Sequence, residues 1–581
     1  MQNRVIANLF PSGIYRSSRA ACRRVGLLLA ALALVGSFAV PAALSQGISG
    51  QGPSTAEPVT IAPDALTDMS VSTVLEKGLL LESDERWGEA LSHYEDALRK
   101  NGSDDKIRQR HDLAKLHYSL GRRYHDRSFK QSVSALNQQQ ALSLYSELLL
   151  KLNTHYVNTP SWRALGVRGT TAIDIALTDQ EFIKTNRLTV TEDQLAQLRQ
   201  EMFQILGRRS VKSSQELVAF ALETAQLVEA RMGLSATTTI LEFVAAAANG
   251  LDNYSTYLTA DQLREVYSQI EGNFVGLGVE LKAENGTLLI VHVIPGSPAE
   301  RSGILGKDRI IAVDGKSTSE MSNDEAASML TGAEGTWVRV TVYSPGAESR
   351  VLNIRREHVE VPSLEEVKII DAENHIAYLR IPTFQKTTSR DLEAALWDLH
   401  RKGMESLILD LRGNPGGLLT SSVEVADKFL TQGRIVSTRG RSAQEDFNYQ
   451  AHYGGTWRVP LVVLIDGDSA SASEIFAGAI KDNHRGTIVG TNSFGKGSVQ
   501  GIFPLGYAGA GIRLTTAKFF SPNGTPISHR GVAPDDSVRF TAKPNLAAKP
   551  TGTDLSAVKS QAKDAILEAG IRAARNRVAA R

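Results

Sequence analysis

The stretch Leu461-Val-Val-Leu-Ile-Asp-Gly-Asp-Ser-Ala-Ser-Ala-Ser-Glu474 changes character after its first five residues. Those five are all apolar, as expected of a strand that is buried on both faces of a parallel sheet. Small polar residues follow, and a helical pattern begins at Ile475. A strand, a short loop and a helix in this order form the unit of an α/β fold, in which loops at the carboxyl ends of the strands carry the chemistry.

The same alternation of apolar runs and helical segments continues on both sides of this stretch. We therefore predict an α/β catalytic core over residues 359–542. Its other strands are expected at His375–Ile381, Leu407–Leu411 and Thr487–Val489, and its helices at Arg390–His400, Val423–Leu430 and Ile475–Lys481.

Residues suited to nucleophilic catalysis occur in three loops that follow these strands. Ser471 opens a helix, whose dipole favours negative charge that develops beside it. The loop Asp410-Leu-Arg-Gly-Asn-Pro-Gly-Gly417 has backbone N–H groups that can complete an oxyanion hole. The loop Gly490-Thr-Asn-Ser-Phe-Gly-Lys-Gly-Ser-Val-Gln500 contains Lys496, and Gln500 shares a face with it if this segment is helical. Ser and Lys form a known catalytic pair, provided that burial lowers the pKa of the lysine from about 10.4.

Each of these features also has an ordinary explanation. Serines commonly cap helices, Pro-Gly-Gly commonly makes a turn, and a lysine is commonly a solvated surface charge. Gly490–Gly497 also comes close to the phosphate-binding pattern of NTPases, but Gly497 stands where a Ser or Thr must bind magnesium. His484 is an alternative base, but it lies in a polar turn after the predicted helix, where a solvated histidine is the ordinary outcome.

Residues 272–358 are predicted to form a small β-rich domain. Strands are expected at Gly276–Leu281, Leu288–Val293, Arg309–Val313 and Trp337–Val342, and a helix at Asn323–Leu330. The region resembles a PDZ domain through Phe274-Val-Gly-Leu-Gly-Val279, Pro295-Gly-Ser-Pro-Ala299 and Gly306-Lys-Asp-Arg-Ile-Ile-Ala-Val-Asp-Gly315.

The loop made of Gly276, Leu277, Gly278 and Val279 is the predicted substrate-binding element of this domain. Its consecutive backbone N–H groups can grip a terminal carboxylate while the peptide adds as a strand beside it. The alternative is a structural β-barrel whose groove is blocked.

The chain before this domain is predicted to be helical over residues 72–140 and again over residues 141–271. Trp87-Gly-Glu-Ala-Leu-Ser-His-Tyr-Glu-Asp-Ala-Leu98 resembles the second helix of a tetratricopeptide repeat. Ala141-Leu-Ser-Leu-Tyr145 echoes it, but not at the period of about 34 residues that such repeats keep. The alternative is a plain helical bundle with an aromatic and leucine core. Residues 72–140 are the region that we expect to recruit an adaptor or to self-associate.

The first 45 residues have the pattern of an export signal. Arginines precede an apolar run over Val25–Ala43, and no acidic residue occurs before Glu57. Ala43 and Ser45 supply the small residues that favour cleavage after residue 45. The run is also long enough to remain as a membrane anchor, so membrane association is the alternative. We expect an exported protein, in the periplasm or on the extracytoplasmic face of the membrane, with a flexible linker over residues 46–71.

The composition fits a folded protein of several domains. Hydrophobic residues make up 42% of the 581 residues and charged residues 22%, which excludes a largely disordered or multi-span membrane chain. The 64 Lys and Arg against 63 Asp and Glu leave no basic field for nucleic acid. The single cysteine, Cys22, precedes the apolar run, so no disulfide is expected. The Ala- and Lys-rich tail over residues 543–581 is expected to be a solvated helix or disordered.

The three loops, in this order, resemble those of the C-terminal processing peptidases, also called tail-specific proteases. The resemblance runs from about Tyr145 to Asp535. It includes the turn Leu251-Asp-Asn-Tyr-Ser-Thr-Tyr-Leu258, and near its end Thr515-Thr-Ala-Lys-Phe-Phe-Ser-Pro-Asn-Gly524 and Gly531-Val-Ala-Pro-Asp535.

This resemblance implies a serine endopeptidase with a Ser/Lys dyad. Ser471 is then the nucleophile, Lys496 the general base and Gln500 the residue that orients the lysine. Gly417 and Ala472 match the positions whose N–H groups form the oxyanion hole. Neither a metal nor a cofactor is implied.

The function that follows is cleavage of exported proteins by acyl-enzyme chemistry, with accessible substrate C-termini recognised by the PDZ-like domain. Residues 72–140 precede the usual start of such proteases. The alternative is a catalytically silent scaffold that holds partners through its helical and PDZ-like parts. The predicted fold class is α+β multidomain, with an α/β catalytic core, an inserted PDZ-like domain and a helical N-terminal region.

Overall fold

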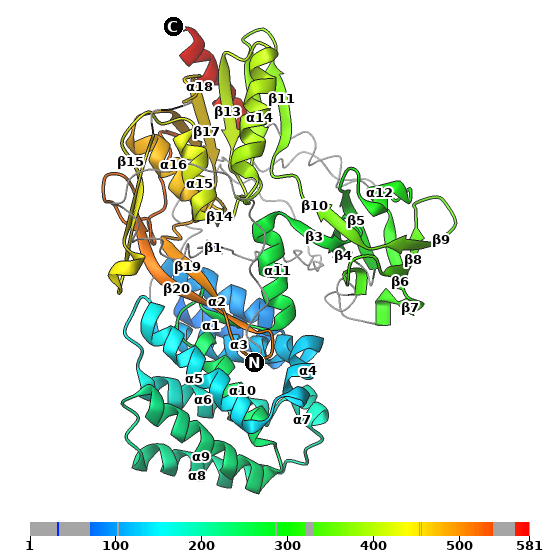
Figure 1. The fold of residues 1–581 in the computed structure, drawn as a ribbon, viewed down its shortest axis with the longest axis vertical. Helices are drawn as coiled ribbons and strands as arrows, with labels where there is room; N and C mark the ends of the chain where they lie inside the picture. Colours follow the sequence, from blue (N-terminus) through cyan, green and yellow to red (C-terminus); the bar gives the residue numbers. More distant parts are fainter. Residues whose placement is uncertain are drawn as a thin grey trace, which may run out of the picture.

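The computed structural model describes residues 32–33, 70–101, 104–284, 287–320, 329–452, 454, 456–538 and 564–579. The fold is α+β and multidomain, as predicted. In Figure 1 an α/β core lies at the top, a helical region at the bottom, and a β-rich domain stands to one side. The predicted export signal and linker lie outside the described residues apart from Leu32–Ala33, Ser70 and Val71, as does the helix at Asn323–Leu330 apart from its last two residues.

The core is built on a six-stranded sheet with the order β11-β12-β13-β17-β18-β21. The strands from β12 to β21 run parallel, and β11 is antiparallel to β12. Their bounds are β11 Glu365–Asp371, β12 Ile376–Arg380, β13 Ser406–Asp410, β17 Leu461–Ile465, β18 Thr487–Gly490 and β21 Asp536–Ser537. The four core strands predicted from the sequence are confirmed, each end to within one residue.

Helices cover both faces of this sheet. Alternate residues of a strand point to opposite faces, so Leu407 and Leu409 pack on one side and Ile408 packs on the other. The first face is covered by α14 (Thr388–Arg401), α15 (Leu419–Asp427) and α16 (Ala472–Asp482). The second is covered by α18 (Ala565–Ala579).

The expectation of a solvated or disordered tail is therefore wrong for α18. Its residues Ile566, Ala569 and Ala574 are buried against the sheet. An Ala-rich helix looks weakly amphipathic in the sequence, but small side chains suffice when the partner is a sheet of Ile, Val and Leu. The burial of α18 depends on packing against core strands that are distant in the sequence, and the local pattern of residues does not reveal it.

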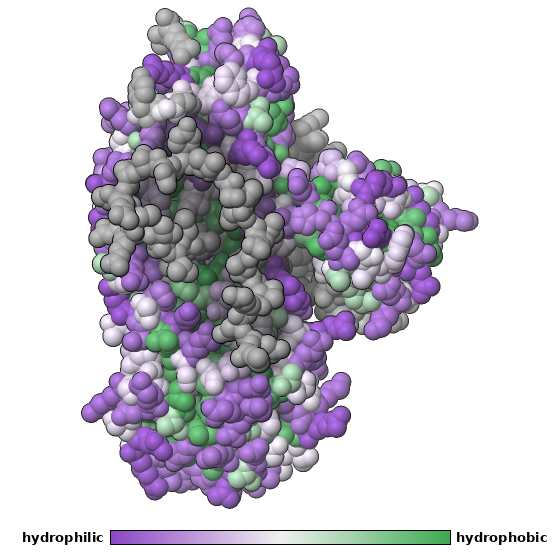
Figure 2. All heavy atoms as spheres, in the orientation of Figure 1, coloured by the Kyte–Doolittle hydropathy of each residue, from purple (hydrophilic) through white to green (hydrophobic). Residues whose placement is uncertain are grey.

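A second sheet joins the core to the helical region. Its strands follow the order β16-β15-β20-β19, and β2 pairs with β20. Their bounds are β2 Thr256–Leu258, β15 Arg434–Gly440, β16 Phe447–Gln450, β19 Ser498–Pro504 and β20 Gly511–Phe520. In Figure 2 apolar residues gather on the displayed face in the band between the core and the helices.

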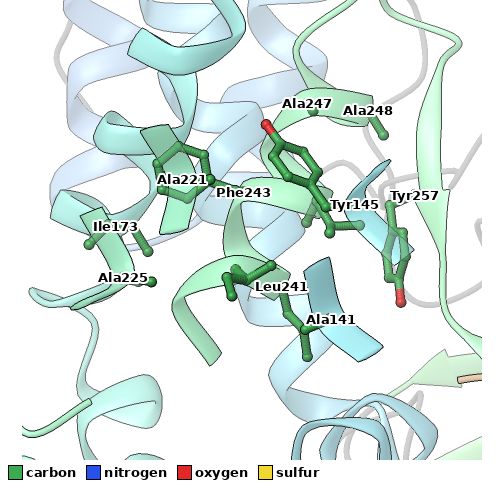
Figure 3. Packing of buried hydrophobic residues seen from close by; sticks show 14 of the residues in the cluster. Ala141, Tyr145, Ile173, Ala221, Ala225, Leu241, Phe243, Ala247, Ala248 and Tyr257 are labelled. Atoms are coloured by element: carbon green, nitrogen blue, oxygen red, sulfur yellow. The ribbon is translucent and has the colours of Figure 1, made fainter. Parts of the chain in front are cut away.

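The helical region is packed around one large apolar cluster. Figure 3 shows Tyr145, Phe243 and Tyr257 within it, and the ring centroids of the first two lie 6.3 Å apart. The helices are α1 Val71–Ser83, α2 Trp87–Asn101, α3 Asp105–His125, α4 Arg127–Ala135, α5 Gln138–His155, α6 Trp162–Ala176, α7 Gln180–Asn186, α8 Glu192–Arg208, α9 Ser214–Met232, α10 Ala236–Asn249 and α11 Ala260–Glu271. Within the described ranges, none of the helices is both long and apolar enough to cross a membrane.

The tetratricopeptide-like segment and its echo fall in different parts of this region. Ala90 and Tyr94 of α2 pack with Val74 of α1 in a small cluster of their own. Ala141 and Tyr145 of α5 belong to the large cluster. Ala141–Tyr145 is thus not the next repeat in a stack with α2. Recruitment of an adaptor or self-association through residues 72–140 stays a prediction.

The β-rich domain has an open-edged sheet with the order β4-β5-β6-β8-β9, and β7 pairs with β6. A separate strand pair, β3 with β10, connects it to the rest of the chain. The bounds are β3 Asn273–Gly276, β4 Val279–Glu284, β5 Thr287–Val293, α12 Pro298–Arg301, β6 Arg309–Val313, β7 Lys316–Ser317, β8 Trp337–Tyr343, β9 Arg350–Arg355 and β10 Glu357–Glu360. A final short pair joins β1 (Leu32–Ala33) to β14 (Gly417–Leu418).

Candidate active site

The carboxyl ends of β13, β17 and β18 meet at one edge of the core sheet, because these strands are parallel neighbours. The loops that follow are Asp410–Gly417, Asp466–Glu474 and Gly490–Gln500. The carbonyl of Asn414 in the first loop accepts hydrogen bonds from the second, from Ala470 N at 2.9 Å and from Ser473 Oγ at 3.0 Å. The structure thus brings the predicted loops together.

Ser471 stands at the amino end of α16 in a strained conformation, with φ 57° and ψ −109°. Positive φ is rare outside glycine, and such strain is common at functional sites. The two neighbouring serines have structural hydrogen bonds, since Ser469 donates its hydroxyl to the Leu411 carbonyl at 2.8 Å and Ser473 donates to Asn414. The geometry therefore separates Ser471 from the other two, which residue type alone cannot do.

The glycine-rich loop passes directly beside Ser471. Gly416 and Gly417 have φ of 114° and 135°. A Cβ on Gly416 would lie 2.9 Å from the Cβ of Ser471 and 3.1 Å from the nitrogen of Ala472, and one on Gly417 would lie 2.2 Å from the Phe384 oxygen. Only glycine fits so close an approach. Ala472 begins α16, so its N–H has no partner within the helix and can serve an oxyanion.

Lys496 is 1% exposed, and its Nζ has no hydrogen-bond partner within the described part of the chain. The centroid of the Tyr254 ring lies 4.7 Å from Nζ. Burial lowers the pKa of Lys496 to about 7, and the positive charge of Arg513 acts in the same direction, while Glu474 opposes it. An amine with this pKa is substantially neutral near pH 7, as a general base must be.

Glu474 joins the loop of Ser471 to the loop of Lys496, and it is not among the site residues predicted from the sequence. Its Oε2 accepts from the backbone nitrogens of Ser471 at 2.7 Å and of Lys496 at 2.9 Å. Its Oε1 accepts from Ser493 Oγ and from Gly495 N, both at 2.6 Å. Burial raises the pKa of Glu474, and these hydrogen bonds oppose the rise. The available signal was a glutamate three residues after a serine, the pattern of a capping box.

Gln500 belongs to strand β19, so the helical reading of this segment is wrong and the spacing does not give Gln500 and Lys496 a shared helical face. Its Nε2 donates to the carbonyl of Ser498 at 3.1 Å and to the hydroxyl of Ser498 at 2.9 Å. Its Oε1, like Lys496 Nζ, is buried without a partner among the described residues.

His484 lies outside this site. It lies two residues beyond the last residue of α16 and is exposed, whereas Ser471 directly precedes the first. The helix of 11 residues puts roughly 16 Å between them along its axis. Over the described ranges, no group of three or more His, Cys, Asp or Glu side chains is arranged to hold a metal ion.

The predicted carboxylate-binding loop lies in the β-rich domain, away from the core sheet (Figure 1). Gly276 ends β3 and Val279 begins β4. The carbonyl of Leu277 accepts from Ala299 N, and that of Gly278 accepts from Ile294 N, each at 2.9 Å. Gly278 has φ 83°, and a Cβ there would lie 2.2 Å from the Cβ of Ser297. The loop is therefore held by its carbonyls, next to the edge strand β4.

Comparison with known proteins places both domains in families. Residues 375–538 match the model of peptidase family S41, and residues 267–343 match the PDZ domain model. A carboxy-terminal-processing protease of Bartonella bacilliformis is 41% identical over 291 residues, which are 49% of this chain and 66% of that relative. A probable CtpA-like serine protease of Staphylococcus epidermidis is 34% identical over 289 residues, which are 49% of this chain and 58% of that relative.

The chain thus spans about two thirds or less of the length of these curated relatives. Among solved structures, the photosystem II D1 C-terminal processing protease is 24% identical, with 68% of this chain and 92% of that chain covered and a TM-score of 0.36. On the two domain matches, the chain carries a peptidase family S41 domain and a PDZ domain.

Proposed function

We propose that the chain is a serine endopeptidase that cleaves exported proteins, with Ser471 as nucleophile and Lys496 as general base. The observation that carries this proposal is the state of the Lys496 amine, which is buried without any hydrogen-bond partner among the described residues. A buried amine without a partner is costly, and a fold tolerates such groups mainly where they have a function. The shared hydrogen bonds to Glu474 hold the backbone of Lys496 near that of Ser471.

The proposed reaction has two halves. Neutral Lys496 takes the hydroxyl proton of Ser471 as the serine oxygen attacks the scissile carbonyl carbon. The N–H groups of Gly417 and Ala472 donate to the oxyanion that forms. The lysine ammonium then gives its proton to the leaving amine, and the acyl-enzyme is released when Lys496 activates a water molecule in the same way. The buried Oε1 of Gln500, which lacks a partner among the described residues, is suited to orient the ammonium.

The PDZ domain is proposed to bind substrate C-termini. Gly276–Val279 supplies consecutive backbone N–H groups, and β4 has an edge that is not covered by any described strand. A free carboxylate at the loop and a peptide strand on β4 would use both features. This supports recognition of tails rather than of internal sequences.

The test is cleavage of a loosely folded exported protein with an apolar C-terminus by the wild-type chain and by Ser471→Ala. We expect cleavage by the wild type alone, and slower cleavage when the tail is amidated. Binding without cleavage by the wild type would favour the alternative of a silent scaffold. Equal rates for free and amidated tails would contradict the role of Gly276–Val279 only.

A further inference from the structure

One neighbour of Lys496 comes from outside the three loops. Tyr254, whose ring lies 4.7 Å from Nζ, belongs to the turn Leu251–Leu258 between α10 and the end of β2. This turn lies outside the matches to both family models, which begin at residues 267 and 375. The lysine is thus covered by a side chain that the helical N-terminal region contributes.

The backbone of this turn is fixed by Asp252. Its Oδ1 accepts from the backbone nitrogens of Tyr254 at 2.8 Å and Ser255 at 2.7 Å, and its Oδ2 accepts from Ser255 Oγ at 3.1 Å. Arg513 on β20 donates through Nε to the carbonyl of Tyr254 at 3.1 Å. Ser255 Oγ also accepts from the nitrogen of Thr515 at 3.1 Å. These bonds fasten the turn to the sheet that joins the core to the helices.

The helices hold the other side of the turn. Lys115 of α3 donates to the carbonyl of Asp252, and the hydroxyl of Tyr156 donates to the carbonyl of Leu251 at 3.0 Å. Tyr257, three residues after Tyr254, packs in the core of the helical region, as Figure 3 shows. The position of Tyr254 therefore depends on α3 as well as on the core.

A second contact links the helices to the loop that carries Lys496. The guanidinium carbon of Arg99, on α2, lies 5.1 Å from the centroid of the Phe494 ring. Phe494 is two residues before Lys496. The α2–α3 pair thus contacts both the turn above the lysine and the loop that contains it.

We propose that Tyr254 is a positioning residue for Lys496, whose ring covers the amine and excludes water, and that Lys115 of α3 holds the turn in place. This inference rests on the proposed role of Lys496 as general base. The helical N-terminal region is then part of the control of the active site, and a change in the packing of α3 would alter the activity without touching the substrate.

The ring of Tyr254 acts on the lysine in two opposite ways. It excludes water, which disfavours the ammonium, and its π face attracts the ammonium, which favours it. Burial is the largest effect on the pKa of Lys496, ahead of the charges that face it, which are Arg513 on β20, Glu474 on α16 and Asp252 in the turn. When the ring is removed, the entry of water should therefore outweigh the loss of attraction by the π face, and the pKa of Lys496 should rise.

The experiment compares Tyr254→Phe, Tyr254→Ala and Lys115→Met in the full chain, with Lys106→Met as the matched control. Lys106 is an exposed lysine on the same helix as Lys115. Two quantities are measured for each variant, the pH profile of kcat/KM and the pH dependence of reductive methylation of Lys496, read by mass spectrometry. The second does not depend on catalysis.

We expect Tyr254→Ala to move the acidic limb of the profile and the methylation midpoint upward by about one unit, with about a fivefold loss of kcat/KM at pH 7. Lys115→Met should shift both in the same direction by less, while Tyr254→Phe and Lys106→Met leave them unchanged. Unshifted midpoints in folded Tyr254→Ala and Lys115→Met overturn the inference. If Tyr254→Ala does not fold, Lys115→Met decides it. An active Lys496→Ala would instead refute the proposed base, while the methylation midpoints would still report on Tyr254.

Discussion

Lys496 in the α/β core is buried and Lys115 in the helical region is partly buried, but within the described part of the chain only the Lys115 amine has a hydrogen-bond partner. Burial lowers the pKa of Lys496 to about 7 and that of Lys115 to about 8. Lys115 donates to a carbonyl, and the carboxylates of Asp252, Glu95 and Asp112 favour its charged form. Lys496 Nζ has no acceptor within the described ranges. Burial alone is therefore not a mark of a catalytic lysine, and the missing partner is the more specific feature.

Because of this difference, we expect substitutions of Lys496 to cause the largest loss of peptide cleavage. Lys496→Ala should reduce peptide cleavage by about 10²–10⁴-fold or more at every pH, nearly as far as Ser471→Ala, because the proposed base is lost. Lys496→Arg should fail as well, since a guanidinium with a pKa above about 12 cannot give up its proton. Lys115→Met should recover near wild-type rates at pH 9, where Lys496 is neutral.

Rates of these folded variants should be measured with one peptide between pH 6 and pH 9. His484→Ala serves as the control for a histidine base and should retain most of the activity, because His484 lies at the far end of α16. An active Lys496→Ala together with an inactive His484→Ala would reverse the assignment.

The second prediction concerns stability, and it also separates the two lysines. Between pH 7 and about 10.5 the unfolded chain binds the proton of Lys496 more tightly than the folded chain, so stability contributed by this group rises with pH. Lys496→Met removes a buried charge below pH 7 and should stabilise the fold by on the order of 2–5 kcal/mol at pH 6, and by less at pH 9.

Denaturant unfolding at the two pH values measures this change. Lys115→Met gives the contrast, because it removes a hydrogen bond along with the charge and leaves the carbonyl of Asp252 without its donor. A Lys496→Met variant that is less stable than the wild type at pH 6 would show that the amine has a stabilising partner after all.

The third prediction tests whether Glu474 holds Lys496 near Ser471. Glu474→Gln replaces a carboxylate that accepts four hydrogen bonds with an amide that has a single acceptor oxygen. Hydrogen bonds to charged groups contribute about 1.5–3 kcal/mol, so we expect about a 10- to 100-fold loss of kcat. Glu424→Gln, on the exposed side of α15, is the control. Unchanged kcat in folded Glu474→Gln would argue against positioning by this carboxylate.

Much of the frame around the site follows from local patterns in the sequence. The core strands are continuous apolar runs, and parallel neighbours bring their carboxyl ends together, so the meeting of the three loops was predictable. Glu474 was missed because a capping box explains a glutamate at that position without any long-range contact. The strand conformation at Gln500 is not predicted, because glycines and polar residues precede Gln500 in the sequence. Pairing of β19 with β20 stabilises this conformation.

Contacts between distant segments account for the rest. Tyr254 is 242 residues from Lys496 along the sequence, and nothing in its own turn points to a lysine. The packing of α18 on the core sheet likewise depends on a surface built from four strands. Such pairings depend on the assembled fold, which local propensities do not encode.

The smallest expected effect is a loss of stability on substitution of Asp564. This residue is one of two partners of Arg412, a cation at the same edge of the core sheet. Arg412 donates to the buried carboxylate of Asp410 and to both oxygens of Asp564, at 2.7 and 2.8 Å. The Asp564 side chain, just before α18, is 43% exposed, so Asp564→Asn should lower the free energy of unfolding by only about 0.2–1 kcal/mol. Asp410→Asn should cost about 3–5 kcal/mol, because Arg412 is largely buried and Asp410 is its buried partner. Denaturant unfolding at pH 7 compares the two. Equal losses would mean that α18 is held to the glycine-rich loop through Asp564 far more strongly than an exposed ion pair allows.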